Sequence, residues 1–291
     1  MTLARIWTVV STNWLRESLN SQVNGKVSRK LRVLDTSFLF DPDVDTYKEC
    51  YKQGHIPQSL HFNMYRCVNR TPERPVNLPD INCFTDYAQE LGIWPDTHVI
   101  TYDRFGPAPA YRTWWLFRTF GHKNISILDG GLRKWLEDGH EVTTEETAVE
   151  RSNFEAKLDK NLLRSYEDVL ENLKSRREQL VDARNPAGDS CTSSENYGGV
   201  IPGAKHIVFE QLFTENGTIK SDRELKELFD SAGVDLGQPI TASCLRGLTA
   251  CGVAAAAHIL GKEHVPVYAG SWWEYSRRAP DDLKALAKKA S

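Results

Sequence analysis

Residues 239–252 read Pro-Ile-Thr-Ala-Ser-Cys-Leu-Arg-Gly-Leu-Thr-Ala-Cys-Gly, and this stretch decides the fold. The β-branched and apolar run 240–242 predicts a short buried strand. The alanine-rich run 250–260 predicts a helix that Thr249 caps and that the following glycine closes. Cys244 therefore lies in a tight loop that joins a strand to a helix.

The loop 244–249 has the features of an anion-binding loop at a helix N-terminus. Its main-chain amides are expected to converge on the sulfur of Cys244, and Gly247 permits a backbone conformation that other residues resist. Arg246 adds a positive charge nearby. Because such surroundings stabilise a thiolate, we interpret Cys244 as a reactive thiol rather than a buried structural one, and Cys251, two helical turns further on, as a core residue.

These residues resemble the active loop of the rhodanese sulfurtransferase family, in which a cysteine followed by a short loop with Gly and Thr carries a persulfide sulfur. The resemblance continues through residues 260–262 and 265–272, which end in Gly-Ser-Trp, and covers nearly the whole chain. It implies that Cys244 takes a sulfane sulfur from a small anionic donor. It also implies transfer of this sulfur to cyanide or to a thiol such as thioredoxin or glutathione, without a metal or an organic cofactor.

The composition limits the number of domains, the kinds of partner and the location that the protein can have. The 291 residues, 40% hydrophobic and 26% charged, suffice for one large domain or two smaller ones. A net charge of −3 gives no general attraction for nucleic acid or anionic membranes. No run approaches the roughly 18 apolar residues of a membrane helix, and residues 1–13 lack the pattern of a secretory signal. Residues 1–10 carry Arg5 and no acid but are too few for a convincing organelle presequence, so a cytoplasmic protein is expected, with a mitochondrial location as the alternative.

The six cysteines show no Cys-x-x-Cys pair and no neighbouring histidine at zinc spacing, so a metal site is not expected. The four outside the active stretch, at positions 50, 67, 83 and 191, are expected to be ordinary thiols.

An internal repeat decides the number of domains. Four segments recur in the same order: 31–36 and 179–184, 54–57 and 199–202, 99–103 and 240–244, 128–135 and 268–275. This order predicts a duplicated domain, with an N-terminal copy at 1–140, a polar linker at 141–160 and a C-terminal copy at 161–291. Within each copy, short apolar strands alternate with helical patterns. The expected fold class is therefore α/β, two tandem rhodanese-like domains, each a parallel sheet with helices on both faces.

The two copies are not equivalent. Where the second has Cys244, the first has Asp103 in a proline-containing loop, so the N-terminal copy is expected to be catalytically inactive. In two-domain members of the family, the N-terminal copy has likewise lost its cysteine and walls the active cleft. The helix after Asp103 carries Trp114, Trp115 and Phe117, which are expected in the core.

The two residues after the cysteine bear on the donor. In the family, thiosulfate enzymes carry two cations there and 3-mercaptopyruvate enzymes a small neutral pair, whereas this chain has Leu245-Arg246. The single cation favours thiosulfate. The expected substrate-binding residues in the loop are Leu245, Arg246, Gly247, Leu248 and Thr249.

A second departure concerns the loop after the Asp-x-Arg motif, where the family usually places donor-binding arginines. Residues 185–204 contain no Lys or Arg, so we expect weak donor binding or a different persulfide donor. Arg184 is expected to form a structural ion pair with Asp182 or another acid, and donor binding is its alternative role. His61, Arg66 and Arg104 of the first copy are candidates to supply charge across the cleft.

Two other functions are conceivable for a protein with this cysteine loop. A cysteine phosphatase of the cell-cycle type needs arginine six residues after the cysteine, and Ala250 stands there. A catalytically weak rhodanese-fold sulfur carrier or interaction module is the open alternative. The missing arginines favour this alternative, and the intact cysteine loop opposes it.

Overall fold

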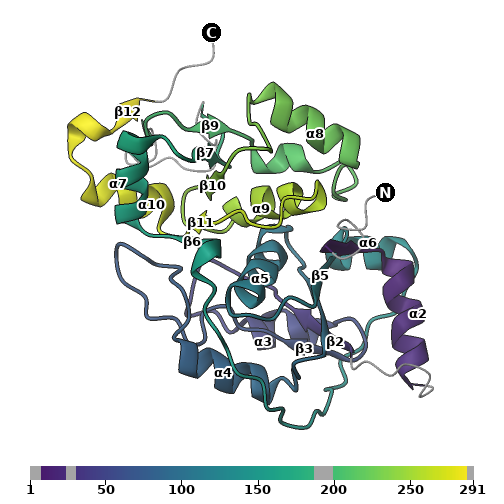
Figure 1. Ribbon diagram of the computed structural model, residues 1–291. Coiled ribbons are helices and arrows are strands. Elements are labelled where there is room, and N and C mark those ends of the chain that lie inside the picture. The colour runs from purple at the N-terminus through teal and green to yellow at the C-terminus, as the bar shows by residue number, and fades with distance from the viewer. Residues whose placement is uncertain (1–7, 24–30, 187–198, 287–291) are drawn as a thin grey trace.

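Each half of the chain forms a five-stranded parallel sheet in the computed structural model, which describes residues 8–23, 31–186 and 199–286 (Figure 1). The first sheet has the order β1-β5-β4-β2-β3 and the second β6-β11-β10-β7-β9. The strands are β1 Val9–Val10, β2 Leu31–Asp35, β3 Ser59–His61, β4 His98–Tyr102, β5 Ile125–Leu128, β6 Leu163–Arg164, β7 Gln179–Asp182, β9 Lys205–His206, β10 Ile240–Ser243 and β11 Val267–Tyr268. A short antiparallel pair, β8 Gly199–Val200 with β12 Ala285–Leu286, completes the second half. The matching orders confirm the duplicated parallel architecture.

Helices cover both faces of the first sheet because its strands alternate their side chains. Leu31 and Val33 of β2 pack in one cluster with residues of α2 and α6, and Leu34 packs on the other face with residues of α4 and α5. The helices of this half are α2 Thr12–Val23, α3 Thr46–Glu49, α4 Ile81–Glu90, α5 Ala108–Thr119 and α6 Gly131–Glu137, with the 3-10 turn η1 Tyr51–Gln53.

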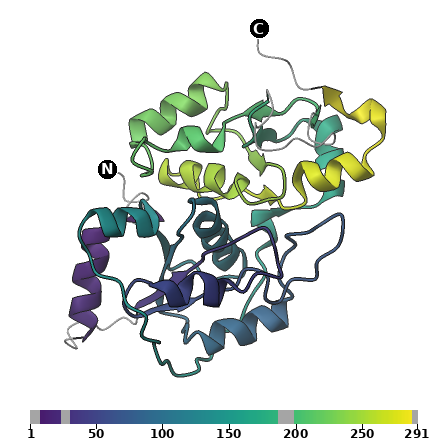
Figure 2. The same ribbon diagram turned by 180° about the vertical axis from the view of Figure 1, so that it is seen from behind.

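The second sheet is covered in the same way (Figure 2). Leu180 of β7 packs with residues of α7 and α10, and the next residue, Val181, packs on the opposite face with residues of α8 and α9. The helices are α7 Tyr166–Ser175, α8 Asp222–Ser231, α9 Ala250–Ile259 and α10 Ser271–Arg278, with the 3-10 turns η2 Lys160–Leu162, η3 Phe209–Leu212 and η4 Asp281–Leu283.

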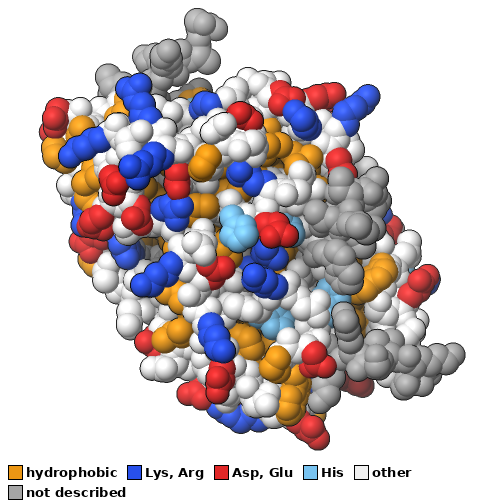
Figure 3. Space-filling model, in the orientation of Figure 1, with side chains coloured by type: hydrophobic (Ala, Val, Ile, Leu, Met, Phe, Trp, Pro, Cys, Tyr) orange, Lys and Arg blue, Asp and Glu red, His pale blue; other side chains and the backbone are white. Residues whose placement is uncertain are grey.

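The surface carries charges of both signs. On the face shown in Figure 3, lysine and arginine side chains lie interspersed with aspartate and glutamate. Across the described ranges, no helix combines the length and the apolar character needed to span a bilayer.

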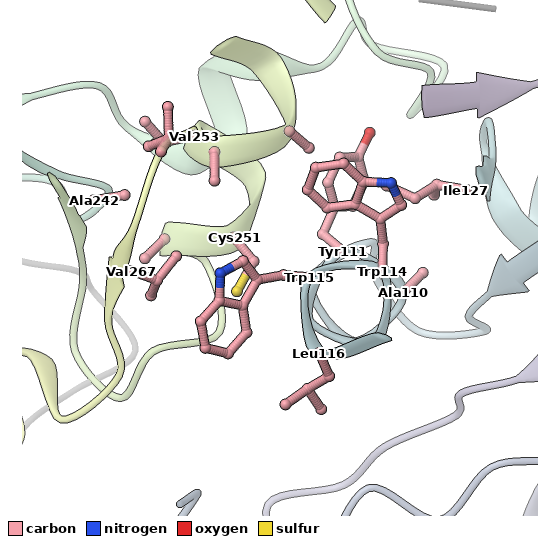
Figure 4. Close-up of a cluster of buried hydrophobic side chains, with 14 of the residues drawn as sticks. Ala110, Tyr111, Trp114, Trp115, Leu116, Ile127, Ala242, Cys251, Val253 and Val267 are labelled. Carbon is pink, nitrogen blue, oxygen red and sulfur yellow. The ribbon is translucent and has the colours of Figure 1, made fainter. Parts of the chain in front are cut away.

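The two halves share one apolar core. Helices α5 and α9 pack against each other, and one buried cluster runs from the first sheet through both helices to the second (Figure 4). Trp114, Trp115 and Phe117 are buried in this cluster, as the sequence predicted. The contact between the halves is therefore part of the core rather than a surface contact.

The segment between the halves, residues 141–160, has no α-helix or β-strand, and it packs along the first half. Phe154 is buried, the Lys157 N–H donates to the Phe120 carbonyl at 3.0 Å and the Asp159 N–H to the Thr119 carbonyl at 2.8 Å. These contacts hold the segment against the first half, so it is not a free linker.

A disulfide joins Cys67 to Cys83, with their Cα atoms 5.4 Å apart. The expectation that both are ordinary thiols is therefore wrong. The Asp80 N–H donates to the Cys67 carbonyl at 2.8 Å, which brings Cys67 beside the first turn of α4. Cys50 is free and buried, and Cys191 lies outside the described residues.

Candidate active site

The predicted catalytic loop 244–249, called the catalytic loop below, lies at the carboxyl end of β10, the central strand of the second sheet, and leads into α9. Cys244 is its first residue and is 1% exposed, so a sulfur donor must approach through a cleft rather than from open solvent. The Gly247 N–H donates to Cys244 Sγ at 3.0 Å. This amide is one of those that the sequence predicted to point at the sulfur.

Both the backbone conformation at position 247 and the small space beside it require glycine. Its φ is +80°, in the left-handed region. A Cβ atom at this position would lie 2.4 Å from the carbonyl oxygen of Ala269. Only glycine therefore lets the loop turn with its amide directed at the sulfur.

The Gly-Ser-Trp stretch supports the cysteine from the adjacent strand end. The Cys244 N–H donates to Ser271 Oγ at 3.0 Å, and the Ser271 hydroxyl donates to the Tyr268 carbonyl at 2.8 Å. The Trp272 N–H donates to the Cys244 carbonyl at 2.9 Å. Ser271 was not among the predicted site residues, although the stretch that contains it was recognised.

Arg246 lies between two aromatic rings. The centre of its guanidinium is 4.3 Å from the ring centroid of Trp273 and 5.3 Å from that of Phe40, which belongs to the first half. This arrangement is a cation–π contact that holds the guanidinium at the boundary between the two halves.

The other loop residues are placed by packing. Leu245 packs against the cluster that contains Tyr268 and Trp272, and Leu248 packs with Phe38 of the first half. Thr249 precedes α9, but its own φ and ψ are helical and its side chain makes no capping hydrogen bond. The expectation that Thr249 caps the helix through its hydroxyl is therefore wrong.

Arg184 pairs with the aspartate of its own motif. Its Nη2 is 2.7 Å from Asp182 Oδ2 and donates to the Gly199 carbonyl at 3.0 Å. The Asp182 carboxylate is fully buried and the Arg184 side chain is 9% exposed. This geometry fits the structural ion pair that the sequence suggested. Residues 187–198, within the stretch that lacks cations, lie outside the described residues.

The three basic residues expected to act across the cleft have other partners. His61 Nε2 is 3.0 Å from Thr46 Oγ1, Arg66 pairs with Glu90 at 2.6 Å, and Arg104 donates to the Cys50 carbonyl at 3.1 Å. All of these contacts lie within the first half. The structure therefore does not bring these residues to the catalytic loop.

Asp103 occupies the place in the first half that Cys244 occupies in the second. The Gly106 N–H donates to Asp103 Oδ1 at 2.9 Å, as the Gly247 N–H does to the sulfur, and in both cases the donor is three residues after the acceptor. Burial raises the pKa of Asp103 to about 7, although the Gly106 amide opposes this shift. The first loop thus has the same geometry, with a carboxyl group in place of the thiol.

Replacing Asp103 by asparagine is expected to stabilise the protein at high pH. Because the pKa of the native carboxyl is raised, the native state binds more protons than the unfolded state between about pH 4 and 7, and the free energy of unfolding falls as the pH rises through this window. The gain of Asp103→Asn over the wild type should be about 3 kcal/mol larger at pH 8 than at pH 5 in urea unfolding. Asp43→Asn, at an exposed position, is the control. An equal gain at both pH values would contradict the assignment.

A cavity of about 450 Å³ lies between the halves. From the catalytic loop, Leu248 and Thr249 line it, and Asp103 faces it from the first half. Its aromatic walls are Phe38, Phe40, Phe105, Phe209 and Phe213. None of these aromatic residues was predicted from the sequence. Phe38, Phe40 and Phe105 lie in loops directly after strands β2 and β4, whereas Phe209 begins η3 and Phe213 follows it.

Cys251 is a core residue, as expected. It is fully buried, and burial raises the pKa of its thiol to about 12. Its S–H donates to the Gly247 carbonyl at 3.4 Å. An uncharged thiol in this place supports the catalytic loop from behind.

Both halves of the chain match the same protein-family model. The family model described as Rhodanese-like domain matches residues 24–138 and again 165–278. Thiosulfate sulfurtransferase of Rattus norvegicus is 42% identical over 289 residues, covering 97% of this chain and 96% of that protein. The 3-mercaptopyruvate sulfurtransferase of Mus musculus is 38% identical over 277 residues, covering 93% and 92%.

Solved structures share the architecture over nearly the full length. SseA from Escherichia coli, described as a 3-mercaptopyruvate sulfotransferase with the rhodanese fold, has a TM-score of 0.79 and 31% identity, covering 91% of this chain and 98% of that one. Tum1 from Saccharomyces cerevisiae, at 20% identity, has the same fold with a TM-score of 0.81. The chain therefore belongs to the rhodanese family and carries two rhodanese-like domains.

Proposed function

We propose that this sulfurtransferase moves the sulfane sulfur of thiosulfate through a persulfide on Cys244. The thiolate attacks the outer sulfur of the donor, the S–S bond of thiosulfate breaks, and sulfite leaves with the electron pair. Cyanide, or a thiol such as glutathione or that of thioredoxin, then takes the outer sulfur and returns Cys244 to its thiolate. Each step conserves charge and needs no external oxidant or reductant.

The observation that carries the proposal is the Gly247 N–H aimed at Cys244 Sγ at a helix N-terminus. A preorganised amide of this kind stabilises negative charge on the sulfur, both in the thiolate and in the persulfide. We propose the remaining loop residues, 245–249, as the surroundings of the donor. We also propose the division into an inactive domain at 1–140, a linker at 141–160 and a catalytic domain at 161–291.

Arg246 is the proposed binding group for the donor. Thiosulfate is a dianion, and a guanidinium offers it two parallel N–H donors. Arg246 follows the nucleophile by two positions and is held by Trp273 and Phe40 at the boundary of the two halves. Arg184, already paired with Asp182, is the weaker candidate.

Arg246→Ala is expected to raise the KM for thiosulfate about tenfold or more, because one charge-assisted contact is worth roughly 1.5–3 kcal/mol. The kcat should change less. The measurement is thiocyanate formation at varied thiosulfate concentration. Arg277→Ala is the matched control, since Arg277 also stacks on Trp273, 3.6 Å from its ring centroid, but lies outside the catalytic loop. If both variants raise KM equally, the effect is not specific to Arg246, and its assignment as the donor-binding group is wrong.

The second donor to test is 3-mercaptopyruvate, because Leu245 departs from the two-cation pattern of thiosulfate enzymes. Both donors are run side by side with the purified protein. Turnover with 3-mercaptopyruvate alone would overturn the choice of thiosulfate. Failure with both donors, together with a Cys244 that cannot be loaded with labile sulfur, would favour the interaction module over the enzyme.

A further inference from the structure

Arg112, in the catalytically inactive half, is a fully buried arginine on α5, at the contact with α9. Its guanidinium lies over the Trp115 ring, 4.5 Å from the centroid. In the described ranges no acidic side chain pairs with it, and its Nε and Nη2 have no hydrogen-bond partner. Burying a cation without an anion destabilises the folded state. We therefore expect Arg112 to have a function that explains its buried position.

A hydrogen bond from Arg112 reaches the catalytic loop. Its Nη1 donates to the carbonyl oxygen of Gly247 at 3.0 Å. The Cys251 thiol donates to the same oxygen at 3.4 Å. This carbonyl is thus held from behind by two buried side chains, one from each half of the molecule.

The contact of Arg112 with the Gly247 carbonyl also sets the direction of the Leu248 N–H, because both belong to one peptide group. In a planar trans peptide, the Gly247 carbonyl and the Leu248 N–H point in opposite directions. By holding the carbonyl toward α5, Arg112 turns the Leu248 N–H away from α5. The same contact fixes the residue whose own N–H donates to Cys244 Sγ.

The charge of Arg112 also acts near the catalytic sulfur. The Arg112 guanidinium and the Cys251 thiol both donate to the Gly247 carbonyl, and the N–H of the same residue donates to Cys244 Sγ, so a single residue separates the cation from the sulfur. The loop carries Leu245 directly after its nucleophile. A buried cation from the other half therefore adds positive charge to a loop that carries a single arginine of its own.

We propose that Arg112 is a positioning residue for the sulfur transfer, which orients the Gly247–Leu248 peptide and offsets the negative charge that Cys244 carries. The inference rests on the proposed persulfide function of Cys244. It assigns to the inactive domain a direct part in the chemistry of the other domain.

The test compares Arg112→Gln, Arg112→Lys and Arg118→Gln in the full-length protein. Arg118 is the matched control because it lies on the same helix, is largely buried and stacks on Trp114, without a contact to the catalytic loop in the described part of the chain. The readouts are kcat for thiocyanate formation and the pH at which alkylation of Cys244 by iodoacetamide is half-maximal, with the site identified by mass spectrometry. The titratable groups around the loop are Arg112, Arg246, Cys251 and, across the cavity, Asp103 and Glu210.

Arg112→Gln is expected to move the alkylation midpoint upward by about one pH unit and to lower kcat about tenfold, as expected for the loss of one nearby buried charge. Arg112→Lys should keep the midpoint and lower kcat, since the charge remains and the hydrogen-bond geometry changes. Arg118→Gln should match the wild type in both. A folded Arg112→Gln with a wild-type midpoint and kcat would overturn the proposal.

Two further outcomes are informative. If Arg112→Gln does not fold, Arg112→Lys decides, and a wild-type kcat in that variant would overturn the positioning role. If the wild type transfers no sulfur from any donor, the proposed function fails. The alkylation midpoints still test Arg112 in that case, because they do not depend on turnover.

Discussion

Cys244→Ser is expected to abolish sulfur transfer, lowering kcat by at least about a thousandfold, with the fold unchanged. Serine keeps the size of the side chain and can still accept the Gly247 N–H, but its hydroxyl neither ionises near neutral pH nor forms a persulfide. The measurement is thiocyanate formation with thiosulfate, together with mass spectrometry of the protein after loading. The wild type should gain one sulfur atom and the variant none.

Cys251→Ser is the matched control for that experiment. The serine hydroxyl can donate to the Gly247 carbonyl in place of the thiol, so most activity should remain. The opposite pattern, with activity retained in Cys244→Ser and lost in Cys251→Ser, would overturn the assignment of the nucleophile.

Gly247→Ala should reduce kcat/KM by about a hundredfold or more. An alanine at φ +80° costs roughly 1–2 kcal/mol, and its Cβ would lie 2.4 Å from the Ala269 carbonyl oxygen, which belongs to the main chain and cannot rotate away. The loop must therefore shift, and the amide that points at Cys244 shifts with it. The effect is measured in steady-state kinetics, with circular dichroism to verify that the variant is folded.

Gly261→Ala separates conformational strain from steric displacement. Gly261 follows α9 with φ +90°, and a Cβ atom there would meet nothing within 4 Å. We expect a stability loss of about 1 kcal/mol and unchanged activity. If Gly261→Ala and Gly247→Ala lower kcat/KM alike, general destabilisation explains both, and the specific role of Gly247 is wrong.

Features encoded locally were predictable from the sequence. The strand, loop and helix around Cys244 follow from residue types within some twenty positions, and the structure places them as β10, the loop and α9. The correspondence of Asp103 with Cys244 follows from the repeated order of segments, and each residue follows the central strand of its own sheet. Trp114 and Trp115 were recognisable as core residues from their spacing and apolar character.

Features that depend on contacts distant in sequence were not predictable. Phe40 and Trp273 meet around Arg246 only because the two halves pack together. The disulfide requires the loop after β3 to fold back on α4, which no spacing of cysteines indicates. Arg112 looks like any arginine of an amphipathic helix until α9 is placed beside it. In each case, the missing information is which surfaces face each other.

The core that runs unbroken through α5 and α9 has a consequence for which substitutions the chain tolerates. Two domains joined only by a flexible linker would accept substitutions independently. Here, the first half supplies apolar partners to the interior of the half that carries Cys244. A substitution that changes the packing of α5 is therefore expected to disturb α9 and the loop before it, more than a hundred positions away in the sequence.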